Sequence, residues 1–216
     1  MVYDLSDLSV AEQDMLIRLP YRVGVWVSES DEGGGDDADA LEKQALNVLI
    51  TAYVEDFCKS EFVQRVMEQT VAQKDRWSQW EDDISSVPEE CKHVMGVLSD
   101  RLPYKELNAF KDNLYEIGYS VAMAYREFDD EASGVVKLTT YVKLWIERVL
   151  ASLKGDVAQS EDEALNISNS ERIALNTLYD ALTQNMSTKT NASLGTNEPL
   201  AQSDEIPLEN TTQNSV

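Results

Sequence analysis

The sequence predicts an all-α protein, a compact bundle of about seven helices followed by a disordered C-terminal tail. Apolar residues recur at helical spacing in successive segments, which is typical of helices with one buried side. Capping residues and prolines stand where these segments begin. No segment shows the alternation of apolar and polar residues that is typical of strands. A helical bundle is therefore the expected architecture.

Capping patterns mark the first two helices. Ser9 followed by Glu12 is a capping-box pattern, in which each side chain accepts a hydrogen bond from the other residue's backbone N–H. Pro20 has no N–H to donate, so we expect a kink or a restart of the helix there. After a glycine-rich break, Asp39 and Glu42 form a second capping pattern ahead of an apolar stripe at helical spacing.

The next helices are expected in the middle of the chain. Ser60 can cap a helix with an apolar side, and Trp77 and Trp80 close it ahead of a polar loop. These tryptophans are expected in the core, with one of them, beside the break, a candidate for an exposed interface anchor. Pro88 starts another helix, and Pro103 marks the entry to a longer one.

Composition changes after Gly155. Beyond it only Arg172 and Lys189 are basic, and Ser, Thr, Asn and Gln dominate. Before it, Ser133 or Gly134 begins a last helix of the body. We predict three regions: a helical domain at 1–155, an acidic linker at 156–183 with an amphipathic helix near 170–182, and a disordered tail at 184–216. The helix near 170–182 either docks on the body or waits for a partner.

The chain is strongly acidic. Its 40 Asp and Glu residues against 18 Lys and Arg residues give a formal net charge of −22. Such a field repels phosphate backbones and anionic membranes, and it attracts cations and basic protein surfaces. We therefore expect no nucleic-acid binding, and we expect any protein partner to be basic. Charge of this size also serves solubility alone.

The sequence gives no sign of export. Its start lacks the basic region and apolar run of a signal peptide, and no apolar stretch approaches the ~18 residues of a membrane helix. Cys58 and Cys91 are too few for a disulfide framework and are expected to be reduced thiols. We therefore expect a cytoplasmic protein without membrane insertion.

A short unit occurs twice. Residues 21–27 (YRVGVWV) return in degenerate form as residues 115–121 (YEIGYSV). An acidic segment follows each copy, at 29–39 and at 127–131. Internal similarity of this kind is typical of two related units that share one core. Gly24 in the first copy would let another part of the chain approach closely.

The two acidic segments are the best candidate for a site. Ca²⁺ and Mg²⁺ prefer several oxygen ligands, which carboxylates and the carbonyls of a glycine-rich loop supply. The candidate ligands are Asp31, Asp36, Asp39, Glu42, Asp129 and Asp130. The first segment does not match an EF-hand, because glycines stand at two ligand positions and Asp36 at the required glycine. Ordinary solvated loop and helix-cap carboxylates are the alternative interpretation.

How the two repeated helices pack decides whether one cation can serve both segments. If the helices are antiparallel, the acidic segments lie at opposite ends of the pair. If the helices lie side by side in the same direction, the segments can converge on one cation. The sequence does not choose between these arrangements.

No catalytic site is expected. Cys91 and His93 form a Cys-x-His pair, but a closed zinc site would need carboxylates to complete it. The sequence has no nucleophile elbow, no phosphate-cradling loop that opens from a strand, and no His-x-x-x-His pair. Its acids crowd into solvent-facing loops, where nothing would raise a carboxyl pKa for acid–base work. We therefore expect a protein that is not an enzyme.

The order of these motifs resembles the TerB-like (tellurite resistance protein B) helical domain over roughly residues 10–153. In that family each repeat has an Ala-Asp-Gly type turn with a Glu at the start of the next helix, and those acids have been proposed to bind divalent metal. Here residues 30–33 (SDEG) stand at the first turn, with Glu42 as the helix Glu. The second turn, at 128–131 (FDDE), has lost its glycine.

The resemblance implies a compact helical module linked to stress response or metal-related resistance, with no established catalytic reaction. Our expectation is a non-enzymatic cytoplasmic binding or scaffold module that binds Ca²⁺ or Mg²⁺ through its acidic segments. The alternative is a metal-free module for protein–protein interaction that uses its acidic face or the helix near 170–182. The sequence does not identify the partner or the oligomeric state.

Overall fold

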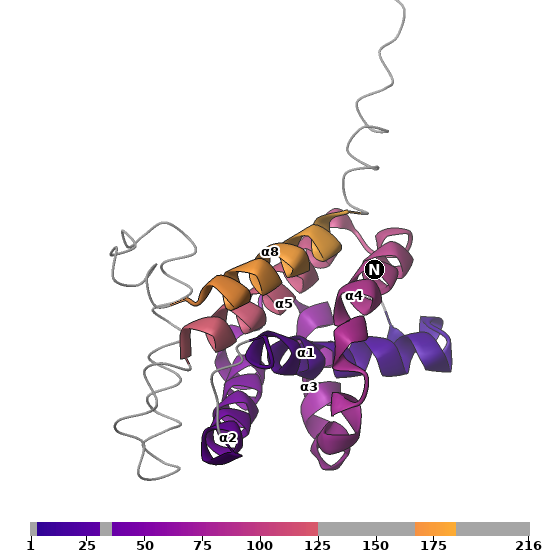
Figure 1. Cartoon of the computed structure of the whole chain (residues 1–216). Helices are drawn as coiled ribbons and strands as arrows, with labels where there is room; N and C mark the ends of the chain where they lie inside the picture. Colours follow the sequence, from indigo (N-terminus) through magenta and orange to yellow (C-terminus); the bar gives the residue numbers. More distant parts are fainter. Residues whose placement is uncertain (1–3, 31–35, 125–166, 185–216) are drawn as a thin grey trace, which may run out of the picture.

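The computed structural model describes residues 4–30, 36–124 and 167–184. The all-α class is confirmed, since these residues form helices and turns and no strand (Figure 1). The α-helices are α1 (Val10–Ser28), α2 (Asp36–Ala52), α3 (Glu61–Ala72), α4 (Val87–Ser99), α5 (Tyr104–Ala124) and α8 (Asn169–Thr183). The helix expected after Ser133 or Gly134 and the tail beyond Gln184 lie outside the described residues.

Shorter helical turns connect these helices. η1 (Leu5–Asp7) precedes α1, and a π-helical turn, η2 (Tyr53–Phe57), extends the end of α2. Between α3 and α4 the chain forms the 3₁₀ turns η3 (Lys74–Glu81) and η4 (Ile84–Ser86).

Helix α1 lies at the centre of the bundle, where it packs against α2, α3, α4, α5 and α8. Its start has the expected capping box: Ser9 Oγ accepts from the Glu12 N–H at 3.3 Å, and Glu12 Oε2 accepts from the Ser9 N–H at 2.8 Å. The expected restart at Pro20 does not occur, because α1 continues to Ser28. Pro20 is buried within the bundle, and packing on several sides offsets the one lost backbone hydrogen bond.

Each glycine of the repeated unit faces a leucine from another helix. A Cβ atom on Gly24 would collide with the Leu46 side chain of α2. A Cβ atom on Gly118 would lie 2.8 Å from Leu178 Cδ2 of α8 and 3.3 Å from Val27 Cγ2 of α1. In both copies the missing side chain therefore makes room for a neighbouring helix.

Helix α8 is the helix that the sequence predicts near 170–182, and it docks on the body. It packs against α4 and α5, and its inner side is buried. The buried residues of α8 are Glu171, Ala174, Leu175, Leu178, Ala181 and Leu182. Of the two alternatives for this helix, the structure has docking, so its apolar side is not available to another protein.

The tryptophans that border the break between α3 and α4 are both buried, each with 3% of its surface exposed. Tyr21 explains this: its ring stacks on Trp77 at 4.5 Å between centroids and meets Trp80 edge-on at 6.3 Å. The Trp77 indole N–H donates to the Thr70 carbonyl at 2.9 Å. The expectation that both lie in the core is therefore confirmed, and neither is the exposed interface anchor that the break offered as a candidate.

Among the described helices, none is both long enough and apolar enough to span a bilayer.

Candidate functional site

The two repeated helices, α1 and α5, run side by side in the same direction. Near their starts, Arg101, just before α5, reaches the beginning of α1: its Nη2 lies 3.5 Å from Glu12 Oε1, and its Nη1 donates to the Asp7 carbonyl at 3.4 Å. Further along, Gly118 of α5 lies against Val27 of α1. Because the N-terminal ends of the two helices lie together and their C-terminal halves lie together, the helices are parallel. Both end on the left of the molecule in Figure 1.

This geometry selects between the two arrangements that the sequence left open. The first acidic segment begins at Glu29, directly after α1, and the second begins at Glu127, shortly after α5. Gly118 is level with Val27, and α5 continues past it to Ala124, a rise of roughly 9 Å at 1.5 Å per residue. The described chain therefore leaves α1 and α5 at the same end of the bundle.

The structure places the candidate ligands only in part. Asp31, Asp129 and Asp130 lie outside the described residues. Asp36, Asp39 and Glu42 belong to the first turns of α2, which begins at Asp36 and not at the cap expected at Asp39. Acids at a helix N-terminus are stabilised by its dipole, which is reason enough for a helix to begin there. Their side chains lie outside what the structure describes.

Within the described ranges, no group of three or more His, Cys, Asp and Glu side chains could hold a metal ion. Cys91 is buried among apolar side chains of α4, and burial raises the pKa of its thiol. His93 is exposed on the same helix. The Cys-x-His pair therefore does not form a zinc site with other described residues.

A buried arginine that the sequence analysis did not single out organises the other side of α1. The Arg22 side chain is 3% exposed, and its Nε donates to Glu90 Oε2 of α4 at 2.9 Å. Its two remaining nitrogens donate to the backbone carbonyls of Trp80, Asp82 (2.8 Å) and Asp83 (2.9 Å) and to the hydroxyl of Ser86 (3.1 Å). All five guanidinium N–H groups are thus used.

The loop that Arg22 holds has an unusual backbone. Asp83 has φ 50°, in the left-handed region that few residues other than glycine adopt. Its carbonyl is one of those that accept from Arg22. Glu90 accepts a second guanidinium, that of Arg18, at 2.7 Å, which brings its carboxylate between two positive charges. The cluster joins α1, the loop before α4 and α4 itself, and it is structural.

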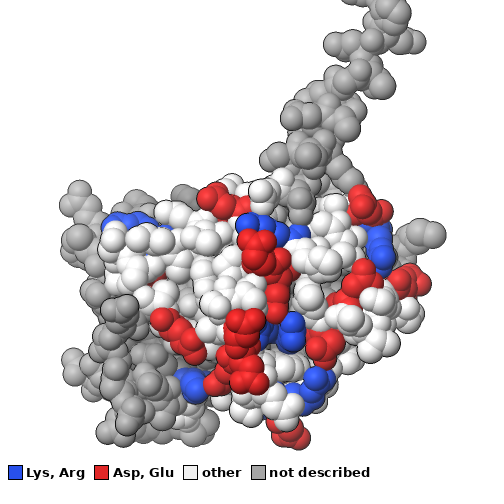
Figure 2. Space-filling model, turned by 45° about the vertical axis from the view of Figure 1, so that its right-hand side comes forward, with Lys and Arg blue, Asp and Glu red and all other residues white. Residues whose placement is uncertain are grey.

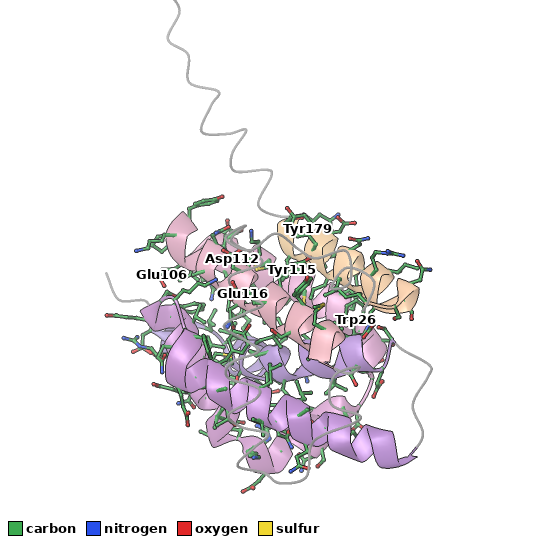
Figure 3. All side chains as sticks on the ribbon, turned by 90° about the vertical axis from the view of Figure 1, so that its left-hand side faces the viewer. Trp26, Glu106, Asp112, Tyr115, Glu116 and Tyr179 are labelled. Carbon is green, nitrogen blue, oxygen red and sulfur yellow. The ribbon has the colours of Figure 1, made fainter. Side chains whose placement is uncertain are left out.

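A second buried charge lies on α5. The Glu116 side chain is 8% exposed and pairs with Lys59, which follows the π-helical turn η2 (Figure 3). Nearby, the Tyr53 hydroxyl lies 3.3 Å from Ser120 Oγ. Burial, and then the charge of Glu116, raise the pKa of Tyr53. Tyr53 therefore stays neutral and cannot serve as a base near neutral pH.

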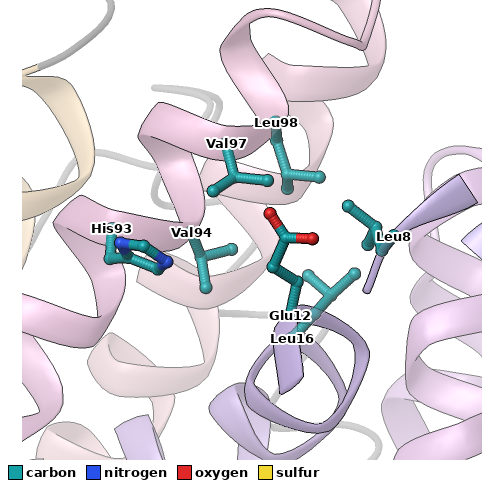
Figure 4. Close-up of a pocket in the computed structure, with 7 residues that line it drawn as sticks. All are labelled: Leu8, Glu12, Leu16, His93, Val94, Val97 and Leu98. Carbon is teal, nitrogen blue, oxygen red and sulfur yellow. The ribbon is translucent and has the colours of Figure 1, made fainter. Parts of the chain in front are cut away.

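A small hollow lies between α1 and α4. Seven residues line it: Leu8, Glu12, Leu16, His93, Val94, Val97 and Leu98, with the Glu12 carboxylate among the apolar side chains (Figure 4). Its cavity volume is about 10 Å³, room for about one water molecule. Pockets for organic ligands are typically 300–1,000 Å³. The hollow is therefore too small to be a substrate site.

The acidic surface is broken by basic side chains. Figure 2 shows a band of acidic side chains down one face, with Lys and Arg beside it. Asp14, for example, lies 3.1 Å from Arg76, and Glu81 lies 2.7 Å from Lys43. Ion pairs of this kind neutralise part of the negative charge within the molecule.

Comparison of the chain with family models, with curated proteins and with solved structures finds no match. The resemblance to TerB-like domains therefore rests on the two motifs and on the order of the helices in the sequence.

Proposed function

We propose that the protein is a non-enzymatic helical binding module of the TerB-like kind, in which the two acidic segments together bind one Ca²⁺ or Mg²⁺ ion. The parallel packing of α1 and α5 is the observation that supports the proposal. It sets the ends of α1 and α5, which the two segments follow in the sequence, at the same end of the bundle. The ligands are Asp31, Asp36, Asp39 and Glu42 from the first segment and Asp129 and Asp130 from the second.

The mechanism is electrostatic. Carboxylates gathered at one end of an acidic bundle repel one another, and a divalent cation among them replaces that repulsion with attraction. A ligand that binds only the folded state stabilises it by mass action. The cation would therefore raise the melting temperature and fix the two acidic segments relative to each other. A partner protein would then recognise the ordered end of the module.

The first test is calorimetric melting of the full chain with CaCl₂, MgCl₂ or NaCl at matched ionic strength. A saturable rise for one divalent ion, beyond the NaCl effect, is the expected result. The double variants Asp31→Asn/Asp36→Asn and Asp129→Asn/Asp130→Asn should each remove most of the rise, because both segments contribute ligands. A matched control is Glu61→Gln/Asp75→Asn, two exposed acids on α3 and η3, which should keep it.

Two outcomes would contradict the proposal. A divalent shift no larger than the NaCl shift would show that the acids are solvated carboxylates. An effect lost with the first double variant but kept in full with the second would show that the segments do not share an ion. The metal-free alternative then rests on the acidic face and a basic partner, since α8 is docked and buries its apolar side.

A further inference from the structure

The two most exposed large apolar residues of the described ranges stand at equivalent positions of the repeat. Val10 is 83% exposed and Tyr104 is 69% exposed. Val10 is the first residue of α1, and Tyr104 is the first residue of α5. They are as far apart in the sequence as Tyr21 and Tyr115, which open the two copies of the repeated unit. Both repeated helices therefore begin with an apolar side chain in solvent.

The parallel packing of α1 and α5 brings these two side chains to one end of the bundle. Arg101, just before α5, reaches Glu12 and the carbonyl of Asp7. These two residues flank Val10 in the sequence, so the starts of the two helices lie together. Side chains of a helix lean toward its N-terminus, so those of a first residue lean toward the end of the bundle. The surface around Val10 and Tyr104 is called the N-terminal patch below.

The charge of the N-terminal patch differs between its two helices. Residues 4–12, which include the start of α1, have three acids and no base. Residues 100–106, which include the start of α5, have two acids and two bases. The α1 side is therefore acidic, and the α5 side is balanced. Two α1 starts would repel each other, whereas an α1 start and an α5 start would not.

We propose that a second copy of this chain docks on the N-terminal patch, so that two bundles meet end to end about a two-fold axis. The axis passes between α1 and α5, perpendicular to both helices, and it sets the start of α1 in each copy against the start of α5 in the other. Val10 of each copy faces Tyr104 of the other, and both side chains leave water. The acidic start of α1 then meets the balanced start of α5.

Charge favours a second copy in this orientation. Two chains of net charge −22 repel each other, and the acidic segments follow the opposite ends of α1 and α5 in the sequence. Helix α5 has 21 residues and is about 31 Å long, so end-to-end docking keeps those opposite ends about 60 Å apart. The Debye length at physiological salt is about 8 Å, so charges that far apart are screened from each other. A basic protein would be drawn to the acidic segments instead, and an anionic membrane would be repelled by the whole chain.

The contact is small, because each copy contributes two large exposed apolar side chains to it. Stable interfaces bury at least ~1,200 Å² and use about 20–30 residues a side. The dimer is therefore weak, with a dissociation constant on the order of 100 µM. It does not need a bound cation. It gives a scaffold whose two acidic ends point away from each other.

Sedimentation equilibrium of the full chain at about 0.15 M salt tests the proposal. The wild type should pass from monomer to dimer between about 10 µM and about 1 mM. Val10→Glu and Tyr104→Lys each place a charge against an apolar side chain of the other copy, twice in the dimer, so each should weaken it about tenfold. An equimolar mixture of these two variants should dimerise again. That heterodimer keeps one contact of Val10 with Tyr104 and replaces the other by an ion pair.

The matched controls are Ile173→Glu and Tyr179→Lys on α8, which put the same charges at two other exposed apolar positions. They should leave the dimer within about twofold of the wild type. All four positions are mostly in solvent, so every variant should keep the melting temperature of the wild type. A wild type that stays monomeric at about 1 mM would overturn the proposal. So would a dimer that the Val10 and Tyr104 variants leave unchanged, that the controls weaken as much, or that the mixture fails to restore.

Discussion

Arg22 of α1 and Glu116 of α5 occupy the same position in the two copies of the repeated unit, and both are buried. Their charges are opposite, and each pairs with an opposite charge from a different element. Arg22 pairs with Glu90 of α4, and Glu116 pairs with Lys59 after η2. One position of the repeat therefore fastens each parallel helix to its surroundings through a buried ion pair.

Removing the guanidinium of Arg22 should destabilise the protein strongly. Arg22→Met leaves a largely buried Glu90 beside only Arg18, and it removes the donors to the carbonyls of residues 80–83. Breaking a buried pair from one side costs about 3–5 kcal/mol. Urea unfolding should show a loss of at least about 3 kcal/mol. Arg22→Lys keeps the positive charge but not the five N–H donors, so it should retain only part of the stability that Arg22→Met loses.

Hydrogen exchange separates this role from a general loss of packing. In Arg22→Met, backbone amides of residues 80–86 should exchange faster than the global unfolding rate allows, because Asp83 loses the donor to its carbonyl. A matched control is Arg65→Met on α3, which changes the same residue type at a half-buried site. A loss in Arg22→Met no greater than in this control would contradict the prediction.

The fold class could be predicted from the sequence because its signals are local. Apolar spacing and capping residues such as Ser9 and Ser60 act within a few residues, and both caps are present. Local rules failed where distant residues decide. Pro20 does not interrupt α1, because the bundle surrounds it. Trp77 is not exposed at the break, because Tyr21, far away in the sequence, stacks on its ring.

The candidate site could be predicted less completely. The repeat located two acidic segments, but the direction of α1 against α5 depends on contacts such as Gly118 with Val27, which no local pattern specifies. Arg22 was passed over because its acceptors lie far along the chain, at residues 80–90. One signal was present: a charged residue at the same place in both copies of an apolar unit, Arg22 and Glu116.

The contact of Gly118 with Leu178 can be measured as a coupling between α5 and α8. Leu178→Ala should cost about 2–5 kcal/mol, since this side chain is fully buried. In the wild type, Gly118→Ala should also destabilise, because its new methyl group meets Leu178 Cδ2 at 2.8 Å. In the Leu178→Ala background the closest of these contacts is gone and only Val27 Cγ2, at 3.3 Å, stays tight, so Gly118→Ala should become much less destabilising, helped by the better helix propensity of alanine.

A double-mutant cycle in urea gives this coupling directly. A coupling energy of at least about 1 kcal/mol, with the double variant more stable than the sum of the single effects, is expected. Gly96→Ala, in the interior of α4, is the control for the propensity of alanine alone. If the effects of the two substitutions on the free energy of unfolding add to within about 0.5 kcal/mol, the close contact between Leu178 and Gly118 is contradicted.

The two thiols should be poorly reactive in the folded protein. Burial, and then the charge of Glu68, raise the pKa of Cys58 to about 11. A raised pKa lowers the thiolate fraction at neutral pH, and the thiolate is the reactive form. Reaction of the native chain with Ellman's reagent should therefore be slow at neutral pH and should accelerate up to about pH 11. Cys91 should react only after unfolding, because it is fully buried.

Single-cysteine variants assign these rates. Cys91→Ala leaves Cys58 as the sole thiol, and adding Glu68→Gln removes the charge that disfavours its thiolate, so the reaction at a given pH should become faster. The raised pKa also makes the free energy of unfolding depend on pH. Because the folded state prefers the neutral thiol, this free energy falls as the pH rises from about 9 to about 11. Fast native reaction of Cys58 at neutral pH would contradict the assignment.

The pair of Lys59 and Glu116 should respond unequally to loss of its two members. Lys59 has 38% of its side chain exposed, whereas Glu116 has 8%. Lys59→Met takes the ammonium away from a buried carboxylate, and solvent screening on the exposed side limits the cost to about 1–2 kcal/mol. Glu116→Met leaves a lysine that can turn to water and places an apolar side chain in the buried position, so its cost should be below about 0.5 kcal/mol.

Urea unfolding of both variants and of the double variant measures the difference. Because the carboxylate is the buried member of the pair, Lys59→Met should be less stable than Glu116→Met. The double variant should be about as stable as Glu116→Met. The reverse order would mean that Glu116 is held by other groups and that Lys59 is a surface residue without a role in the fold.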